Sequence, residues 1–124
     1  YRTSEFPAFY SRSSGLPLAL RVESAVEAAE LFSAHRRLGF AQGILLANPV
    51  AEEWEIPPAD INRFIARAVD ELEEKGIRGQ AVTPFLLSRI VELSGGRSLE
   101  TNVRLFHSNV RLGCEIAEAL CRAV

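Results

Sequence analysis

Three asparagines stand where their side chains could meet a ligand. Asn102 and Asn109 are seven residues apart in a segment with helical apolar spacing, so they share one face of the predicted helix. Asparagine gains little from its intrinsic helix propensity, so the pair indicates polar groups directed at a specific partner; a hydrogen bond inside the fold is the alternative. Asn48 follows the apolar run 43–47 and precedes Pro49. Ligands gather beyond the carboxyl ends of strands in open α/β sheets, which makes Asn48 a candidate binding residue.

Two further groups of side chains could do chemistry but have a simpler interpretation. Glu52, Glu53 and Glu55 form a carboxylate cluster, and paired carboxylates support acid–base catalysis when their environments differ. They lie in a polar loop, which favours solvated charges instead. No cysteine or histidine cluster has the spacing of metal ligands. His35 and His107 are interpreted as packed or solvent-facing side chains.

Two predicted helix starts complete the set of candidate sites. Thr83 precedes Pro84 and is predicted to be a helix N-cap, with the proline in the first helical position. Gly95-Gly96 precede Ser98, which is predicted to cap the following helix. Backbone donors at such a start can bind an anion; a helix C-cap followed by an N-cap is the alternative. A polar site is therefore expected near Asn48, Thr83 and the helix that carries Asn102.

Composition describes an ordinary soluble protein and excludes several classes of function. Of the 124 residues, 48% are hydrophobic and 24% charged, with a formal net charge of −2. That charge argues against broad nucleic-acid binding, which needs a basic field. No apolar run approaches the roughly 20 residues that cross a bilayer, and no secretory signal opens the sequence. We therefore expect neither a nucleic-acid nor a membrane partner.

The two cysteines indicate the cellular compartment, and the first residue indicates whether the sequence is complete. Cys114 and Cys121 would lie about 10 Å apart on a helix, too far for a disulfide. We predict reduced, partly buried thiols and a cytoplasmic location, with an organelle as the open alternative. The sequence contains no methionine and begins at Tyr1, from which we expect that upstream sequence is absent.

Two short strands and four helices must position these side chains. The apolar run 43–47, bounded by glycine and Asn-Pro, is typical of a strand covered on both faces. A Ser-x-x-Glu capping box opens the first helix at Ser24. Both strands look too buried to be sheet edges, so partner strands are expected outside this chain. The predicted strands are 19–22 and 43–47, and the predicted helices are 25–37, 59–75, 83–93 and 99–123.

Four phrases in the sequence resemble the pseudouridine-5′-phosphate glycosidase family, also called the indigoidine synthase A-like family. They are FPAFYSRSSGLPLALRVES, GILLANPVAEE, GIRGQAVTPFLLSRIVELSGGRSLETN and NVRLFHSNVRLGCEIAEAL. The combination of ANP, TPFLL and GG-x-SL-x-x-N is specific, whereas each motif alone is weak. The resemblance covers almost the whole chain and implies that residues 1–124 are the C-terminal part of a single glycosidase domain. The implied fold is α/β, an α/β/α arrangement with a mixed central sheet that is mostly helical within this chain.

The resemblance also implies an activity. Family members reversibly cleave the C–C glycosidic bond of pseudouridine 5′-phosphate to uracil and ribose 5-phosphate, with a divalent metal such as Mn²⁺, as homotrimers. A lysine adduct would supply the electron sink that a C–C bond requires. The implied lysine, metal-binding aspartate and acid–base glutamate lie N-terminal to this segment, and Lys75, the only lysine here, does not match the nucleophile's motif.

The residue-by-residue transfer is therefore limited to substrate binding. Asn102 matches the asparagine of GG-x-SL-x-x-N, and Thr83 and Asn48 match family positions. Ser108 departs from relatives that have a second asparagine beside the one at Asn109. No catalytic residue and no metal ligand is assigned to this chain, which is expected to be inactive alone. The alternatives are a non-catalytic fragment that serves folding or oligomerisation, and a related glycosidase acting on another nucleotide.

Overall fold

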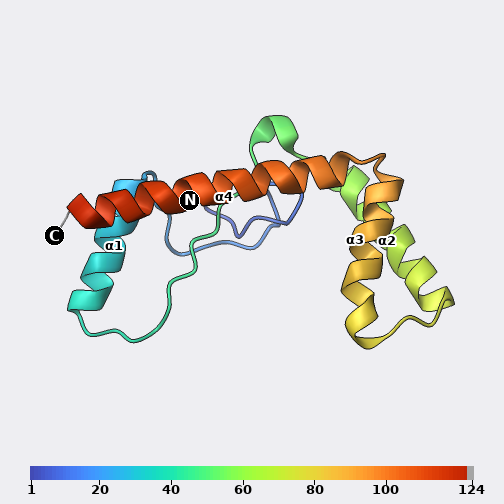
Figure 1. Cartoon of the computed structure of the whole chain (residues 1–124), viewed down its shortest axis with the longest axis horizontal. Coiled ribbons are helices and arrows are strands. Elements are labelled where there is room, and N and C mark those ends of the chain that lie inside the picture. The colour runs from blue at the N-terminus through green and yellow to red at the C-terminus, as the bar shows by residue number, and fades with distance from the viewer. Residues whose placement is uncertain (123–124) are drawn as a thin grey trace.

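The computed structural model describes residues 1–122 and is mostly helical, as predicted for this chain. Figure 1 shows α4 running along most of the molecule, with α1 at one end and the α2–α3 hairpin at the other. The extended segments that contain residues 1–24 and 38–57 lie mainly along one side of α4. The helices are α1 (Ala25–Arg37), α2 (Pro58–Glu74), α3 (Val82–Leu93) and α4 (Arg97–Arg122), with 3-10 turns η1 (Glu52–Trp54) and η2 (Gly79–Ala81).

Helix α1 begins and ends where its sequence signals place it. The Ser24 hydroxyl accepts a hydrogen bond from the Glu27 backbone N–H at 3.1 Å, which satisfies one orphan donor of the first turn. The Glu27 carboxylate accepts from the backbone N–H of Glu23 at 2.7 Å, one residue before the usual capping-box position. Gly39 follows the C-cap Leu38 with φ +78°, a conformation that favours glycine.

The α2–α3 hairpin contains much of the buried apolar core. Ile61 and Ala68 of α2 and Ile90 of α3 pack with Tyr10 and Ile56 from the extended segments. The buried residues of α2 are thus spaced as on one face of a helix, with Leu72 continuing the row. Burial raises the pKa of the Tyr10 phenol, an effect that a hydrogen bond with a buried serine hydroxyl of α4 partly offsets. The core therefore ties the N-terminal segment to one end of the molecule.

Two predicted N-caps are wrong. Helix α3 begins at Val82, after η2, so Thr83 lies inside its first turn and makes no capping bond. Ser98 lies inside α4, and the hydroxyl of Ser94 accepts the Ser98 backbone N–H at 3.1 Å. The 3-10 turn η2 leads directly into α3, so the helix begins one residue earlier than predicted. The buried Ser94 precedes α4 and can accept from the free backbone N–H groups of its first turn, which Ser98, inside the helix, cannot.

The two predicted strands, 19–22 and 43–47, are wrong within residues 1–122. Segment 19–22 forms no strand; the nearest pairing is a single antiparallel bridge between Glu5 and Pro17. Two backbone hydrogen bonds flank this bridge, from Phe6 N–H to the Leu16 carbonyl and from Leu18 N–H to the Ser4 carbonyl, and the pairing extends no further as a ladder. Segment 43–47 is irregular, and no backbone N–H in it has a hydrogen-bond partner among the described residues. The mixed sheet is therefore not seen in this part of the chain.

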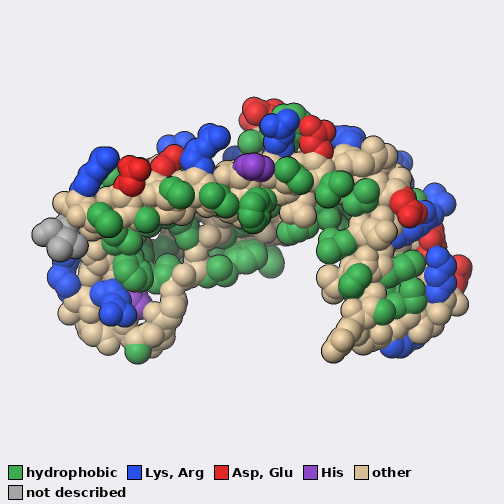
Figure 2. Space-filling model, viewed as in Figure 1, with side chains coloured by type: hydrophobic (Ala, Val, Ile, Leu, Met, Phe, Trp, Pro, Cys, Tyr) green, Lys and Arg blue, Asp and Glu red, His purple; other side chains and the backbone are tan. Residues whose placement is uncertain are grey.

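The chain exposes more surface than a compact protein of its size. Its accessible area is 8505 Å², about 1,900 Å² more than the roughly 6,600 Å² expected for a compact monomer of this mass. Figure 2 shows apolar side chains along α4 and around the hollow beside it. No helix within residues 1–122 is both long and apolar enough to span a membrane.

The cysteines differ from the prediction in their burial. Cys114 and Cys121 are unpaired, as their helical spacing requires, but both are exposed rather than partly buried. Both lie at solvent-exposed positions of α4, which their sequence neighbours did not indicate.

Candidate functional site

Asn48 is held against α4 by its side-chain amide. Its Nδ2 donates to the hydroxyl of Ser108 at 3.0 Å and to Oδ1 of Asn109 at 2.8 Å. These partners are 60 and 61 residues away in sequence. The structure thus joins Asn48 to Asn109 of the predicted asparagine pair. Ser108 supplies the other acceptor.

A hollow of about 630 Å³ opens beside this polar corner. Its walls are residues 6–9, residues 45–48 and the face of α4 from Leu105 to Ile116. Most of this lining is apolar, and the Asn48 and Asn109 amides provide its polar groups. Within residues 1–122 neither Oδ1 of Asn48 nor Nδ2 of Asn109 has a hydrogen-bond partner. One acceptor and one donor group therefore remain for a planar polar ligand.

The segment that follows Asn48 is fixed at two further points. The Thr101 hydroxyl donates to the backbone carbonyl of Trp54 at 2.8 Å, and the Arg104 guanidinium lies 4.3 Å from the Trp54 ring centroid. Arg12 donates to the carbonyl of Val50 at 2.7 Å. These contacts hold residues 50–54 on α4 and on the N-terminal segment. They position Asn48 by fixing the chain directly after it.

The carboxylate cluster is divided between structure and solvent. Glu55 accepts the backbone N–H of Arg12 at 2.7 Å, so its carboxylate has a structural role. Glu52 and Glu53 are exposed in η1, and Glu53 accepts the Trp54 indole N–H at 3.1 Å. The interpretation as loop charges rather than an acid–base pair fits these contacts. Among residues 1–122 no group of three or more histidine, cysteine or acidic side chains could hold a metal ion.

Asn102 and Thr83 lie apart from the Asn48 corner. Asn102 is half-buried on α4, seven residues before Asn109, about 10 Å along the same face. Its side chain has no hydrogen bond within residues 1–122. Thr83 is exposed in the first turn of α3, at the end of the hairpin away from α4 (Figure 1). The structure therefore places Asn102 on the helix face that Asn48 contacts, but about 10 Å from the corner, and does not bring Thr83 near either residue.

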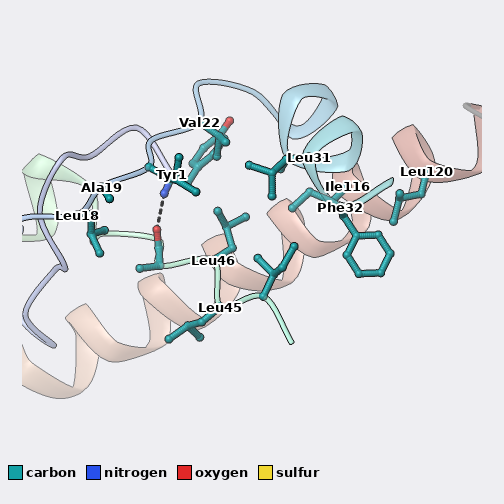
Figure 3. A pocket seen from close by; sticks show the side chains of 14 residues that line it. Tyr1, Leu18, Ala19, Val22, Leu31, Phe32, Leu45, Leu46, Ile116 and Leu120 are labelled. Carbon is teal, nitrogen blue, oxygen red and sulfur yellow. Dashed lines mark hydrogen bonds between the residues drawn. The ribbon is translucent and has the colours of Figure 1, made fainter. Parts of the chain in front are cut away.

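A second hollow, of about 540 Å³, lies between α1, α4 and the extended segments. Figure 3 shows Phe32, Leu46 and Ile116 among the apolar side chains around it, and the bond from the Tyr1 amine to the Ala47 carbonyl at its edge. The lining offers few polar groups to a sugar phosphate, so this hollow is a packing surface.

The site is a set of neutral hydrogen-bonding groups. Amides and hydroxyls bind and orient a ligand, but they do not titrate near neutral pH and are poor general bases. Thr101 was missed by sequence reasoning, because a threonine inside a helix gives no signal of a distant carbonyl partner. The Asn109 spacing, in contrast, did indicate a polar face. The contact between Asn109 and Asn48 could be recognised only from the three-dimensional structure.

Comparison with known proteins places the chain in a family. The model of the indigoidine synthase A-like proteins matches residues 1–119, and the chain belongs to this family. A pseudouridine-5′-phosphate glycosidase of Methylobacterium nodulans is 50% identical over 97% of the chain and 36% of its own length. One from Caldanaerobacter subterraneus is 48% identical over 97% of the chain and 39% of its own length. The chain thus spans about two-fifths of these relatives.

Two solved structures share the fold of this segment. The prealnumycin C-glycosynthase AlnA, in complex with ribulose 5-phosphate, superposes with a TM-score of 0.88 at 29% identity, over 99% of the chain and 40% of AlnA. An indigoidine synthase A-like protein of Thermotoga maritima gives a TM-score of 0.81 at 39% identity, over 94% of the chain and 38% of its own length. Both likenesses cover nearly the whole chain.

Proposed function

We propose that this chain is the substrate-binding C-terminal part of a pseudouridine-5′-phosphate glycosidase that cleaves a C–C glycosidic bond to uracil and ribose 5-phosphate. Family membership supports the class of reaction, and relatives that carry this name are 47–50% identical to the chain. The AlnA likeness, with its ribulose 5-phosphate ligand, supports a sugar phosphate as substrate. The observation that carries the proposal is the hollow whose polar corner joins Asn48 to Asn109.

The chemistry of the base fits this corner. Uracil presents alternating N–H donors and carbonyl acceptors in one plane, and a primary amide offers both kinds of group. Apolar walls around a few placed polar groups are the usual composition of a small-molecule site. Asn48 and Asn109 are assigned to the base, and Asn102 to the base or the opened sugar. Thr83, exposed and distant from them, is assigned no contact on the same subunit.

Bond breaking is assigned to groups outside this chain. Lys75 lies at the C-cap of α2, with its Nζ 4.9 Å from the Phe85 ring centroid, and it lines neither hollow. A divalent metal such as Mn²⁺ supplies charge stabilisation when bound, but residues 1–122 offer no set of ligands for it. We therefore assign neither a metal ligand nor a covalent catalytic residue to this chain. A homotrimer in the cytosol is the assembly that we propose for the complete enzyme.

A chimera tests the proposal. This chain replaces the matching segment of the Caldanaerobacter glycosidase, and uracil release from pseudouridine 5′-phosphate is followed by chromatography with Mn²⁺. We expect turnover by the chimera, its loss with a chelator, and none by the chain alone. Turnover by the purified chain would contradict the assignment of bond breaking. An inactive but folded chimera would favour the non-catalytic module, and release of base from an N-linked nucleotide would favour a related glycosidase.

A substitution in the chimera tests Asn102. Asn102→Ala should lower kcat/KM by about 10- to 100-fold, which corresponds to the loss of a hydrogen bond of about 1.5–3 kcal/mol to a polarised substrate. Because Asn102 makes no hydrogen bond within residues 1–122, the melting temperature should change little. Asn62→Ala, at an exposed position of α2, is the matched control and should leave both quantities unchanged. An unchanged rate with a large loss of melting temperature would make Asn102 structural.

A further inference from the structure

One face of α4 carries large apolar side chains that are largely open to solvent in the described part of the chain. The members of this α4 stripe are spaced by four, three and four residues, which places them in one row along a helix. About half or more of each side chain is open to solvent. They are Leu99 (53% exposed), Val103 (47%), Phe106 (64%) and Val110 (51%).

The other side of α4 is already covered. Thr101 and Leu112 are buried, and they lie roughly 140–160° around the helix axis from the stripe. Helix α1 and the segment around Asn48 pack on that side of α4. A helix that is apolar on two opposite sides is typical of one buried between two layers. Only one of those layers is present within residues 1–122.

We propose that the α4 stripe docks the part of a family-length chain that lies outside the segment matched here. The relatives devote about three-fifths of their length to that part, since the matched segment is 36–40% of them. The excess surface of about 1,900 Å² exceeds the roughly 800 Å² that each partner buries in a stable interface. A row of four apolar side chains on a rigid helix is suited to a packed partner.

Docking on this stripe changes the surroundings of Asn102. Asn102 lies about 60° around the helix axis from the stripe, between the covered side and the open side. A partner seated on Leu99, Val103 and Phe106 therefore encloses the Asn102 amide and completes a wall of the site. The docking surface itself rests on exposure and spacing, so its failure would leave the substrate assignment standing.

A matched pair of valines tests the surface. Val110→Asp places a charge on the stripe, and Val26→Asp places one on α1, where the side chain is 57% exposed. Valine and aspartate have similar helix propensities, so neither change should alter the helicity of the isolated chain. The chain is co-expressed with the tagged remainder of the Caldanaerobacter glycosidase, and the affinity of the purified pair is measured. We expect Val110→Asp to weaken binding at least tenfold and Val26→Asp to leave it unchanged.

The full-length chimera gives a second measurement. There Val110→Asp should lower the melting temperature by several degrees, although it leaves the helicity of the isolated chain unchanged. Val26→Asp should change neither the melting temperature nor the helicity. Equal effects of both substitutions, or no effect of Val110→Asp in the chimera, would overturn the proposal. Failure of the wild-type chain to bind the remainder would also overturn it. If the isolated chain instead self-associates and Val110→Asp makes it monomeric, the occupant is a second copy and our assignment is wrong.

Discussion

The link between Asn48 and Asn109 should be measurable as a coupling free energy. Asn48 Nδ2 donates at 3.0 Å to Ser108 and at 2.8 Å to Asn109. A net hydrogen bond contributes about 0.5–1.5 kcal/mol, and exposure of Asn109 favours the lower half of that range. Asn48→Ala loses both bonds and should lower the free energy of unfolding by about 1–2 kcal/mol. Asn109→Ala loses one and should cost about 0.5–1 kcal/mol.

The double variant separates the pair from its surroundings. Because both single variants remove the same bond, the double variant should be more stable than the sum predicts, with a coupling of about 0.5–1 kcal/mol. Urea unfolding followed by far-ultraviolet circular dichroism gives each value. Asn102→Ala is the control on the same helix face and should change stability by less than about 0.5 kcal/mol. Additive costs for Asn48 and Asn109, or a cost for Asn102→Ala equal to that of Asn48→Ala, would refute this account of the corner.

Two further predictions concern the backbone and the charges. Gly96→Ala, at φ +88° between α3 and α4, should lower the free energy of unfolding by about 1–2 kcal/mol. Gly113→Ala inside α4, where no atom lies within 4 Å of the added carbon, should raise it by about 0.5–1 kcal/mol. Equal effects of the two substitutions in urea unfolding would contradict this. The hydrogen bond from Arg89 lowers the pKa of Glu71, so its stabilisation is present above the pKa of an unfolded glutamate and is lost as pH falls through the lower folded value. Glu71→Gln should flatten the acid side of the stability–pH profile, and an unchanged profile would exclude this ion pair as its cause.

Helix signals in the sequence are local, which is why they predicted the helices well. Ser24 caps α1 by accepting a hydrogen bond from a residue three positions on, so both partners of the capping bond lie within the local sequence. The N-cap predictions for α3 and α4 failed because another local arrangement takes their place: η2 leads directly into α3, and the Ser94 hydroxyl accepts the Ser98 backbone N–H across Gly95-Gly96. Boundaries moved by a residue or two, while the existence of each helix was readable.

Strands depend on partners that a single segment cannot encode. The run 43–47 has the apolar character of a buried strand, yet no backbone N–H within it has a partner in residues 1–122. Segment 16–22 makes only scattered backbone hydrogen bonds with residues 2–6 and a single bridge, too few for a strand. The sequence therefore indicated the apolar character of these segments, and within residues 1–122 they have no partner strand.

The candidate site shows the same division between local and distant causes. The seven-residue spacing of Asn102 and Asn109 indicated one helix face, and the structure places both on that face of α4. That Asn48 meets Asn109 depends on a contact across 61 residues, which no local pattern contains. Its amide donors are already used in fastening the corner, so Asn48 can offer a ligand only its carbonyl oxygen. Asn102 has both amide groups unused within residues 1–122 and stands next to the open stripe. Asn102, which the family resemblance favoured, is thus also the residue whose surroundings would change most when a partner covers α4.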